Sequence, residues 1–280
     1  MKNIAVIGSG TMGNGIAHVF AQHDYTVFLV DTNIQLIDKA IGTISNNLDR
    51  QIKKGTLNEL QKEVTLNNIV KIVGHQNIPE NIDLVIEAVF ESKEVKKNIW
   101  TDITEKVSQE CILSTNTSSI SITELSPKSR SGKFIGMHFM NPVPVMKLVE
   151  IIRGYSTSDE TFQTIKDLTL KIDKVPVEVK DYPGFVSNRI LMPMINEAIF
   201  TLNEGVASAE DIDTVMKLGM NHPMGPLTLA DYIGLDVCLS IMEVLYDGFN
   251  DSKYRPCPLL KKMVAAGKLG KKSGEGFYKY

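Results

Sequence analysis

The sequence has few cysteines, little excess charge of either sign and a single tryptophan. Its 280 residues include three cysteines and carry a formal net charge of −3 at pH 7. An odd number of widely spaced cysteines argues against a disulfide framework and against a zinc site. Because acidic and basic residues are mixed along the chain, nothing favours nucleic acid or an anionic membrane as a partner.

Two further features are missing, a secretory leader and a long apolar run. The N-terminus leads directly into a strand-like segment, without the charged start, apolar core and cleavage site of a signal peptide. No apolar run approaches the ~18 residues that a membrane-spanning helix needs. We therefore expect a cytoplasmic protein, large enough for one main domain and a smaller one.

A glycine pattern follows the first apolar segment. Residues 3–7 have the composition of a buried strand, and Gly8-Ser-Gly10-Thr11-Met12-Gly13 then leads into a helix-compatible stretch that reaches Gln22. The first glycine permits a tight turn, the second lets the backbone approach a pyrophosphate, and the third lets the helix pack closely on the strand. The strand before and the helix after the glycines predict a dinucleotide site that uses Gly8, Gly10, Thr11, Met12 and Gly13.

Asp31 ends the second apolar run, Thr26-Val-Phe-Leu-Val, about 20 residues beyond the glycines. A carboxylate there accepts hydrogen bonds from a ribose 2′-hydroxyl and repels a 2′-phosphate. The nearest cation downstream, Lys39, lies too far along the chain to pair with such a phosphate. The sequence therefore predicts NAD as the cofactor.

Strand-like runs alternate with helical periodicity through most of the chain, which predicts a Rossmann-type, mainly parallel sheet covered by helices. The long polar stretch 34–67 predicts two projecting helices broken near Gly55. Thr157-Ser-Asp-Glu160 matches a capping box that opens a helix reaching about Ile172. After Pro183-Gly184 helical patterns dominate. We therefore predict an NAD-binding domain over 1–184 and a helical domain over 185–280. Further strands are expected at 69–73, 83–88, 112–115, 134–139, 148–152 and 175–179, and further helices at 185–202, at 208–218 and after Gly234.

A histidine and a glutamate lie on two neighbouring apolar segments, at His138 and Glu150. An imidazole titrates near pH ~6.5 when unperturbed, so it can accept and return a proton close to neutrality. A carboxylate on its other ring nitrogen would fix its tautomer and position. Taken alone, a histidine between apolar residues such as Met137 and Phe139 is more often a hydrogen-bonded core residue than a catalyst.

Several motifs together resemble the L-3-hydroxyacyl-CoA dehydrogenase family, and most closely its short bacterial members, the 3-hydroxybutyryl-CoA dehydrogenases. The resemblance spans essentially the whole chain, with two small departures, Thr115 where the family usually has Ser and Met140 where it usually has Phe. The motifs are Gly8-Ser-Gly-Thr-Met-Gly13, Thr115-Asn-Thr-Ser-Ser119, His138-Phe-Met-Asn-Pro142, Pro183-Gly-Phe-Val-Ser-Asn-Arg189, His222-Pro-Met-Gly-Pro226 and Gly270-Lys-Lys-Ser-Gly-Glu-Gly-Phe-Tyr278.

The resemblance implies that His138 is the general base and that Glu150 holds its imidazole. Ser118 and Asn188 would donate hydrogen bonds to the 3-oxygen of an acyl-CoA thioester. Glu91 and Lys96 match positions that contact NAD, Asn116 and Asn141 would shape the cofactor site, and Lys53 and Lys54 match a basic stretch that meets CoA phosphates. From the spacing of the cysteines and histidines we expect no metal. The helical domain would form a homodimer and help to close the site.

Other interpretations remain open at this point. Lys53-Lys54 could be a solvated helix face, and apolar helical stripes such as Ile195, Ile199 and Leu202 cover intramolecular cores as well as dimer interfaces. The enzyme could act on another acyl-CoA or on a free 3-hydroxy acid. A non-catalytic NAD-binding sensor would keep the glycines and Asp31, but it has no use for a base, its orienter and hydrogen-bond donors together.

Overall fold

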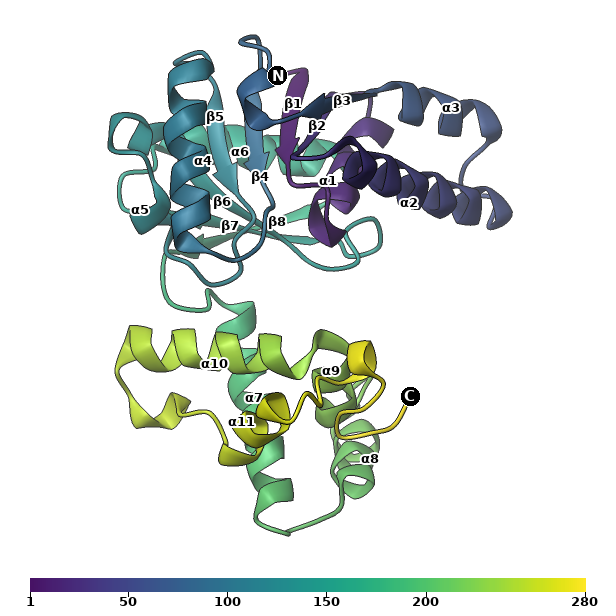
Figure 1. Cartoon of the computed structure of the whole chain (residues 1–280), viewed down its shortest axis with the longest axis vertical. Coiled ribbons are helices and arrows are strands. Elements are labelled where there is room, and N and C mark those ends of the chain that lie inside the picture. Colours follow the sequence, from purple (N-terminus) through teal and green to yellow (C-terminus); the bar gives the residue numbers. More distant parts are fainter. The chain divides into compact units, whose positions relative to one another are not determined.

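The apolar segments of the first 181 residues form one eight-stranded sheet (Figure 1). A computed structural model describes all residues, 1–280. The strands are β1 (Asn3–Ile7), β2 (Thr26–Asp31), β3 (Ile69–Val73), β4 (Leu84–Glu87), β5 (Ile112–Thr115), β6 (Phe134–Phe139), β7 (Leu148–Arg153) and β8 (Val175–Lys180). Every predicted strand is present, with ends that differ from the prediction by one residue at most.

The strand order is β3-β2-β1-β4-β5-β6-β7-β8. All neighbouring pairs are parallel except β6 and β7, which are antiparallel. The central strands β4, β5 and β6 are buried along their whole length, as strands covered on both faces are. The chain reverses the direction of strand addition between β1 and β4, which is where such sheets bind ligands at their carboxyl edge.

Helices connect these strands: α1 (Thr11–Gln22), α2 (Ile34–Lys53), α3 (Glu59–Asn67), α4 (Lys93–Lys106), α5 (Ile122–Leu125) and α6 (Asp159–Lys171). Two of them, α2 and α3, pack on each other beyond the β3 edge of the sheet (Figure 1). The predicted break is confirmed, because α2 ends before Gly55, which has a φ of 72°. An Asn58–Gln61 capping box then starts α3.

The predicted capping box at Thr157 is wrong. Ser158 is the N-cap of α6, and its hydroxyl accepts a hydrogen bond from Thr161 N. The Thr157 hydroxyl instead donates to the Phe134 carbonyl at 2.6 Å. A tertiary contact with the start of β6 therefore uses the side chain that the local pattern assigned to the cap.

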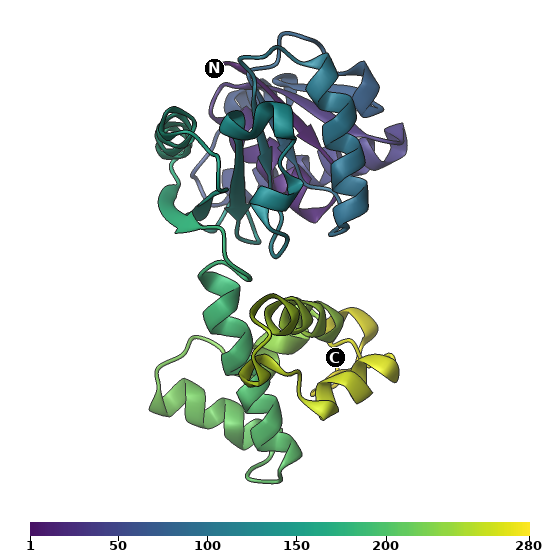
Figure 2. The same cartoon turned by 90° about the vertical axis from the view of Figure 1, so that its left-hand side faces the viewer.

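The remaining residues, Tyr182–Tyr280, form a second unit that consists mainly of helices (Figure 2). Its helices are α7 (Ser187–Asn203), α8 (Ala209–Gly219), α9 (Pro226–Ile233), α10 (Leu235–Phe249) and α11 (Pro258–Ala265). The unit has its own apolar core, to which Ile195 and Ile199 contribute with at most 1% of their surface exposed. These two residues of the predicted stripe therefore cover an intramolecular core.

The predicted fold class, a Rossmann-type sheet followed by a helical domain, is confirmed. No helix combines the length and the apolar character needed to cross a membrane. The three cysteines are free and buried.

Candidate active site

The glycine loop between β1 and α1 has the geometry that its sequence predicts. Gly8 has a φ of 97°, and a Cβ on Gly13 would lie 1.7 Å from the Gly8 carbonyl oxygen. A Cβ on Gly10 would meet no atom within 4 Å, so the exposed side of this residue is open space. The loop thus fits a dinucleotide, because it needs glycine for packing at Gly13 and leaves room for an approaching group at Gly10.

Asp31 ends β2 and is tied to the same loop. Its Oδ2 accepts hydrogen bonds from Ser9 N at 2.8 Å and Ser9 Oγ at 2.6 Å, and its Oδ1 accepts one from Thr32 N at 2.7 Å. Partial burial opposes ionisation, but the hydrogen bonds from Ser9 and Thr32 outweigh it and lower the pKa of Asp31. The carboxylate is therefore charged at neutral pH.

A pocket of about 460 Å³ lies over this loop. Gly10, Thr11 and Asp31 line it, and Asn141 and Pro142 form another part of its wall. Lys39 of α2 also lines it. The sequence alone gave no ground for an argument about Lys39, but the first turns of α2 bring it to the pocket that contains Asp31.

His138 and Glu150 face each other across the antiparallel pair of β6 and β7. They are partners in the strand register, and directly opposed residues project on the same face of a sheet. The distance between His138 Nδ1 and Glu150 Oε2 is 2.8 Å. Both residues are buried, with 6% and 2% of their surface exposed. The structure thus brings together the two residues that the sequence singled out as base and orienter.

Asn116 connects this pair to the centre of the sheet. Its side-chain Oδ1 accepts a hydrogen bond from Phe139 N at 2.9 Å, directly after His138. Its backbone N donates to the Glu87 carbonyl at 2.7 Å, where β4 ends. Asn116 is itself buried. Its two hydrogen bonds connect the end of β6 to the end of β4.

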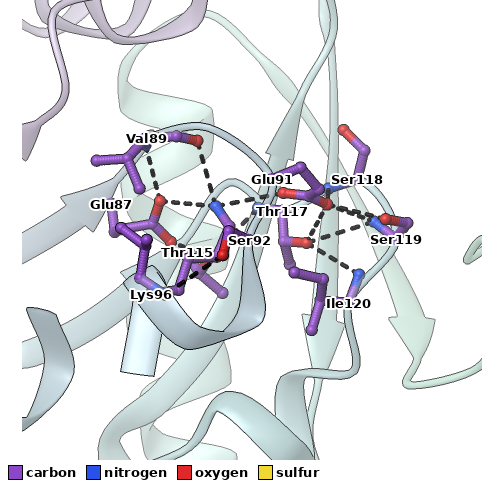
Figure 3. Close-up of polar contacts among 11 residues, drawn as sticks. Glu87, Val89, Glu91, Ser92, Lys96, Thr115, Thr117, Ser118, Ser119 and Ile120 are labelled. Atoms are coloured by element: carbon purple, nitrogen blue, oxygen red, sulfur yellow. Dashed lines mark hydrogen bonds and ion pairs between the residues drawn. The ribbon is translucent and has the colours of Figure 1, made fainter. Parts of the chain in front are cut away.

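Glu91 and Lys96 belong to a network that includes a residue not predicted from the sequence, Glu87 (Figure 3). Lys96 Nζ lies 2.7 Å from Glu87 Oε1 and 3.3 Å from Glu91 Oε2. Glu87 and Lys96 have 0% and 1% of their side-chain surface exposed. Burial raises the pKa of Glu91, but Lys96 and hydrogen bonds from Thr117, Ser119 and Ser118 outweigh it, and the net pKa is lowered.

The segment Thr117–Thr123 is held by two carboxylates. Glu91 Oε1 accepts hydrogen bonds from the backbone of Ser118 and Ser119, at 2.9 and 3.1 Å, and from both the Thr117 and Ser119 hydroxyls (Figure 3). At the other end of the segment, Asp181 accepts from Ser121 Oγ, Ile122 N, Thr123 N and Thr123 Oγ1. For the neighbouring contacts of Lys96, the one indication in the sequence is the charged Glu87 at the end of a buried strand.

The other predicted residues belong to other elements of the chain. Ser118 follows β5 and is partly buried, and Lys53 and Lys54 are exposed at the end of α2. Asn188 is buried in the first turn of α7, in the second unit. The predicted roles of these four residues remain predictions.

Family profiles match nearly the whole chain. The profile described as "3-hydroxyacyl-CoA dehydrogenase, NAD binding domain" matches residues 3–182, and "3-hydroxyacyl-CoA dehydrogenase, C-terminal domain" matches residues 184–280. The chain belongs to the 3-hydroxyacyl-CoA dehydrogenase family. It is accordingly an NAD-dependent oxidoreductase, as the glycine loop and Asp31 predict.

Similar members of the 3-hydroxyacyl-CoA dehydrogenase family cover the full length of the chain. A protein of Deinococcus radiodurans named probable 3-hydroxybutyryl-CoA dehydrogenase is 54% identical, with 98% of this chain and 99% of the relative covered. The 3-hydroxybutyryl-CoA dehydrogenase of Bradyrhizobium diazoefficiens is 50% identical, over 100% and 96%. The crystal structure of (S)-3-hydroxybutyryl-CoA dehydrogenase from Ralstonia eutropha is 48% identical, with a TM-score of 0.95 over 100% of this chain and 99% of that one.

Proposed function

We propose that this dehydrogenase interconverts (S)-3-hydroxybutyryl-CoA and acetoacetyl-CoA, with His138 as the general base and acid. The observation that carries the proposal is the buried His138–Glu150 pair, 2.8 Å apart, on the sheet that bears the NAD loop. The substrate comes from the names of relatives that are about half identical over their full length.

NAD, when bound, would accept the hydride that leaves the 3-carbon of the alcohol. Gly8, Gly10, Thr11, Met12 and Gly13 would hold its pyrophosphate at the start of α1, where backbone N–H groups face an anion. Asp31, Asn141, Glu91, Lys96 and Asn116 would complete the cofactor site. Asp31 is ionised and lines the pocket, which supports a contact with ribose hydroxyls.

The proton of the 3-hydroxyl would pass to His138. When Nδ1 carries a hydrogen and donates it to Glu150, the neutral ring presents Nε2 as the acceptor. Glu150 then stabilises the imidazolium that forms and holds its orientation. In the reverse direction the same imidazolium returns the proton to the oxygen. Ser118 and Asn188 would donate hydrogen bonds to that oxygen as its charge changes, a contribution of about 10²–10³ in rate for one donor in comparable sites.

The CoA part of the substrate would meet the helix pair α2–α3. Lys53 and Lys54 are exposed at the end of α2, so their ammonium groups can reach a phosphate without losing an internal partner. We assign residues 1–184 to NAD binding, and residues 185–280 to dimerisation and closure of the site.

The homodimer is supported by apolar side chains on and beside α8. Val215, Leu218 and Met220 expose 59%, 82% and 61% of their surface. Exposed apolar residues that lie this close together in the chain favour a protein interface. This face replaces the stripe of Ile195 and Ile199, which lies inside the second unit's own core.

The test is NADH oxidation followed by absorbance, with acetoacetyl-CoA or free acetoacetate, for wild type and His138→Ala. We expect turnover of the thioester alone and its loss in the variant. His75→Ala is the matched control, because His75 also pairs with a carboxylate, Asp102 at 2.7 Å, but on the exposed surface. That control should keep wild-type turnover.

Three outcomes would contradict the proposal in whole or in part. Turnover of free acetoacetate would assign a free 3-hydroxy acid as substrate. Tight NADH binding without turnover of either substrate would indicate a sensor. Retained thioester turnover in His138→Ala would leave the substrate in place but remove His138 as the base.

A further inference from the structure

Glu87 is a buried carboxylate to which neither the motifs nor the resemblance assigns a role. It is the last residue of β4 and pairs in register with Ile7 of β1 and Thr115 of β5. Its side chain has 0% of its surface exposed. Glu87 therefore lies at the carboxyl edge of the central strands, where sheets of this type bind their dinucleotide.

Both oxygens of Glu87 have defined partners. Oε1 accepts hydrogen bonds from Val89 N at 2.8 Å and Lys96 Nζ at 2.7 Å, and Oε2 accepts one from Thr115 Oγ1 at 2.7 Å (Figure 3). A buried charge is tolerated only when it is paired and hydrogen-bonded. Glu87 thus has its place fixed by two strands and by α4.

Lys96 is shared between two carboxylates. Its ammonium also lies 3.3 Å from Glu91 Oε2, on the side of Glu91 away from the Thr117–Ser119 turn. The other oxygen, Glu91 Oε1, accepts the four hydrogen bonds from that turn, including the one from Ser118 N at 2.9 Å. A continuous chain of contacts therefore leads from Glu87 through Lys96 and Glu91 to Ser118.

We propose that Glu87 is a positioning residue for the dehydrogenase reaction, which acts through Lys96 and Glu91 to set the place of Ser118. The inference rests on the proposed function, since it takes Ser118 as a donor to the substrate oxygen. Glu87 holds the Lys96 ammonium near the end of β4. Glu91 therefore contacts Lys96 with Oε2 alone, and its Oε1 remains available to the Thr117–Ser119 turn. Without the charge on Glu87, Lys96 follows Glu91, and the contacts with the turn loosen.

A double-mutant cycle tests this coupling, with kcat measured for wild type, Glu87→Gln, Ser118→Ala and the double variant. Glu87→Gln keeps the size of the side chain and leaves Lys96 paired with Glu91, so no lone buried charge remains. We expect Glu87→Gln to lower kcat by about 10- to 100-fold in the wild-type background, as a misplaced site does. In the Ser118→Ala background the same change should lower kcat by less than about twofold, because the path then ends at a missing hydroxyl.

The outcomes separate the two proposals. If Glu87→Gln lowers kcat equally in the wild-type and Ser118→Ala backgrounds, Glu87 has only a structural role and the positioning proposal is overturned. The proposed role of Ser118 as a donor would be unaffected. Wild-type kcat in Ser118→Ala would overturn both. Nearly complete loss of the Glu87 effect in that background would support both.

Two further variants guard against a folding artefact. Thr115→Val removes the hydroxyl that donates to Glu87 Oε2 and keeps the side chain at nearly the same size. We expect it to lower kcat less than Glu87→Gln does, and we expect this effect also to disappear in the Ser118→Ala background. If Thr115→Val folds and its effect is independent of Ser118, the proposal fails even when Glu87→Gln is insoluble. Glu110→Gln is the control, because Glu110 also pairs with a lysine, Lys133, but just before β5 begins, at the opposite edge of the sheet. It should leave kcat unchanged.

Discussion

Substitution of Glu150 tests directly how much the orientation of His138 contributes to catalysis, because His138 itself is retained. Glu150→Gln keeps the size and one acceptor but removes the charge that stabilises an imidazolium and selects its tautomer. We expect kcat with acetoacetyl-CoA to fall by about 10²-fold or more, as when an orienting carboxylate is neutralised elsewhere. NADH affinity, measured by fluorescence titration, should change little. An unchanged kcat would show that His138 needs no orienter.

Asp31 and Lys39 line one pocket with opposite charges, and this bears on the choice between NADH and NADPH. Asp31→Ser removes the negative charge that would repel a 2′-phosphate, and Lys39 remains to attract it. We expect the NADH dissociation constant to rise about tenfold, or 1.4 kcal/mol, and turnover with NADPH to increase. Adding Lys39→Ala should reverse the gain with NADPH. No NADPH turnover in Asp31→Ser would contradict this account.

Among the elements, the β1–α1 loop allows two glycines to be tested for different functions. Gly10→Ala adds a methyl group that meets no protein atom, whereas Gly13→Ala places one 1.7 Å from the Gly8 oxygen. We expect Gly10→Ala to keep its thermal midpoint and lose NADH affinity at least tenfold, because the methyl group occupies the approach to the pyrophosphate. Gly13→Ala should lower the thermal midpoint as well. Wild-type NADH affinity in Gly10→Ala would contradict the proposed place of the pyrophosphate.

Helix α1 also carries a buried histidine, His18, beside α2. Burial lowers the pKa of His18 from 6.5 to about 4, and the charges of Lys174 and His23 lower it further. Between these two pH values the unfolded chain binds a proton that the folded chain does not. Stability should therefore fall as the pH drops from about 6.5 to 4, by up to about 3 kcal/mol.

His18→Gln removes this titration and keeps a polar side chain near Gln51. Urea unfolding at several pH values should show a shallower decline in free energy for the variant within that window. At pH 8 the pH-dependent difference between the two proteins vanishes. Parallel curves for variant and wild type would show that other groups cause the decline.

For the whole molecule, the exposed apolar face at α8 predicts the state of assembly. Leu218→Glu places a charge where 82% of a leucine is exposed, and a charge in a dimer interface is costly unless it is paired. We expect sedimentation velocity to show a dimer for wild type and a monomer for Leu218→Glu. Leu170→Glu on α6 is the control, because Leu170 is also exposed, at 53%, but lies in the first unit. A dimer in Leu218→Glu would locate the interface elsewhere.

Local pattern was sufficient for much of this protein. The β1–α1–β2 segment, the NAD preference from Asp31 and the break near Gly55 all follow from residues close together in the chain, because turns, caps and buried strands have short-range signatures. The pairing of His138 with Glu150 was predicted from their place in two short apolar runs together with the family motifs around them. Their 2.8 Å contact, however, needs β6 and β7 to run antiparallel in one particular register.

Contacts between distant segments account for the rest. Glu87 meets Lys96 and Thr115 only because β4, β5 and the first turn of α4 converge at one edge of the sheet. Lys39 lines the same pocket as Asp31 because of the direction of α2, and the Thr157 hydroxyl donates to the Phe134 carbonyl instead of capping α6. These partners cannot be predicted from the spacing of residues along the chain, because a hydrogen bond depends on distance in space. Each side chain also has several possible partners that compete for it.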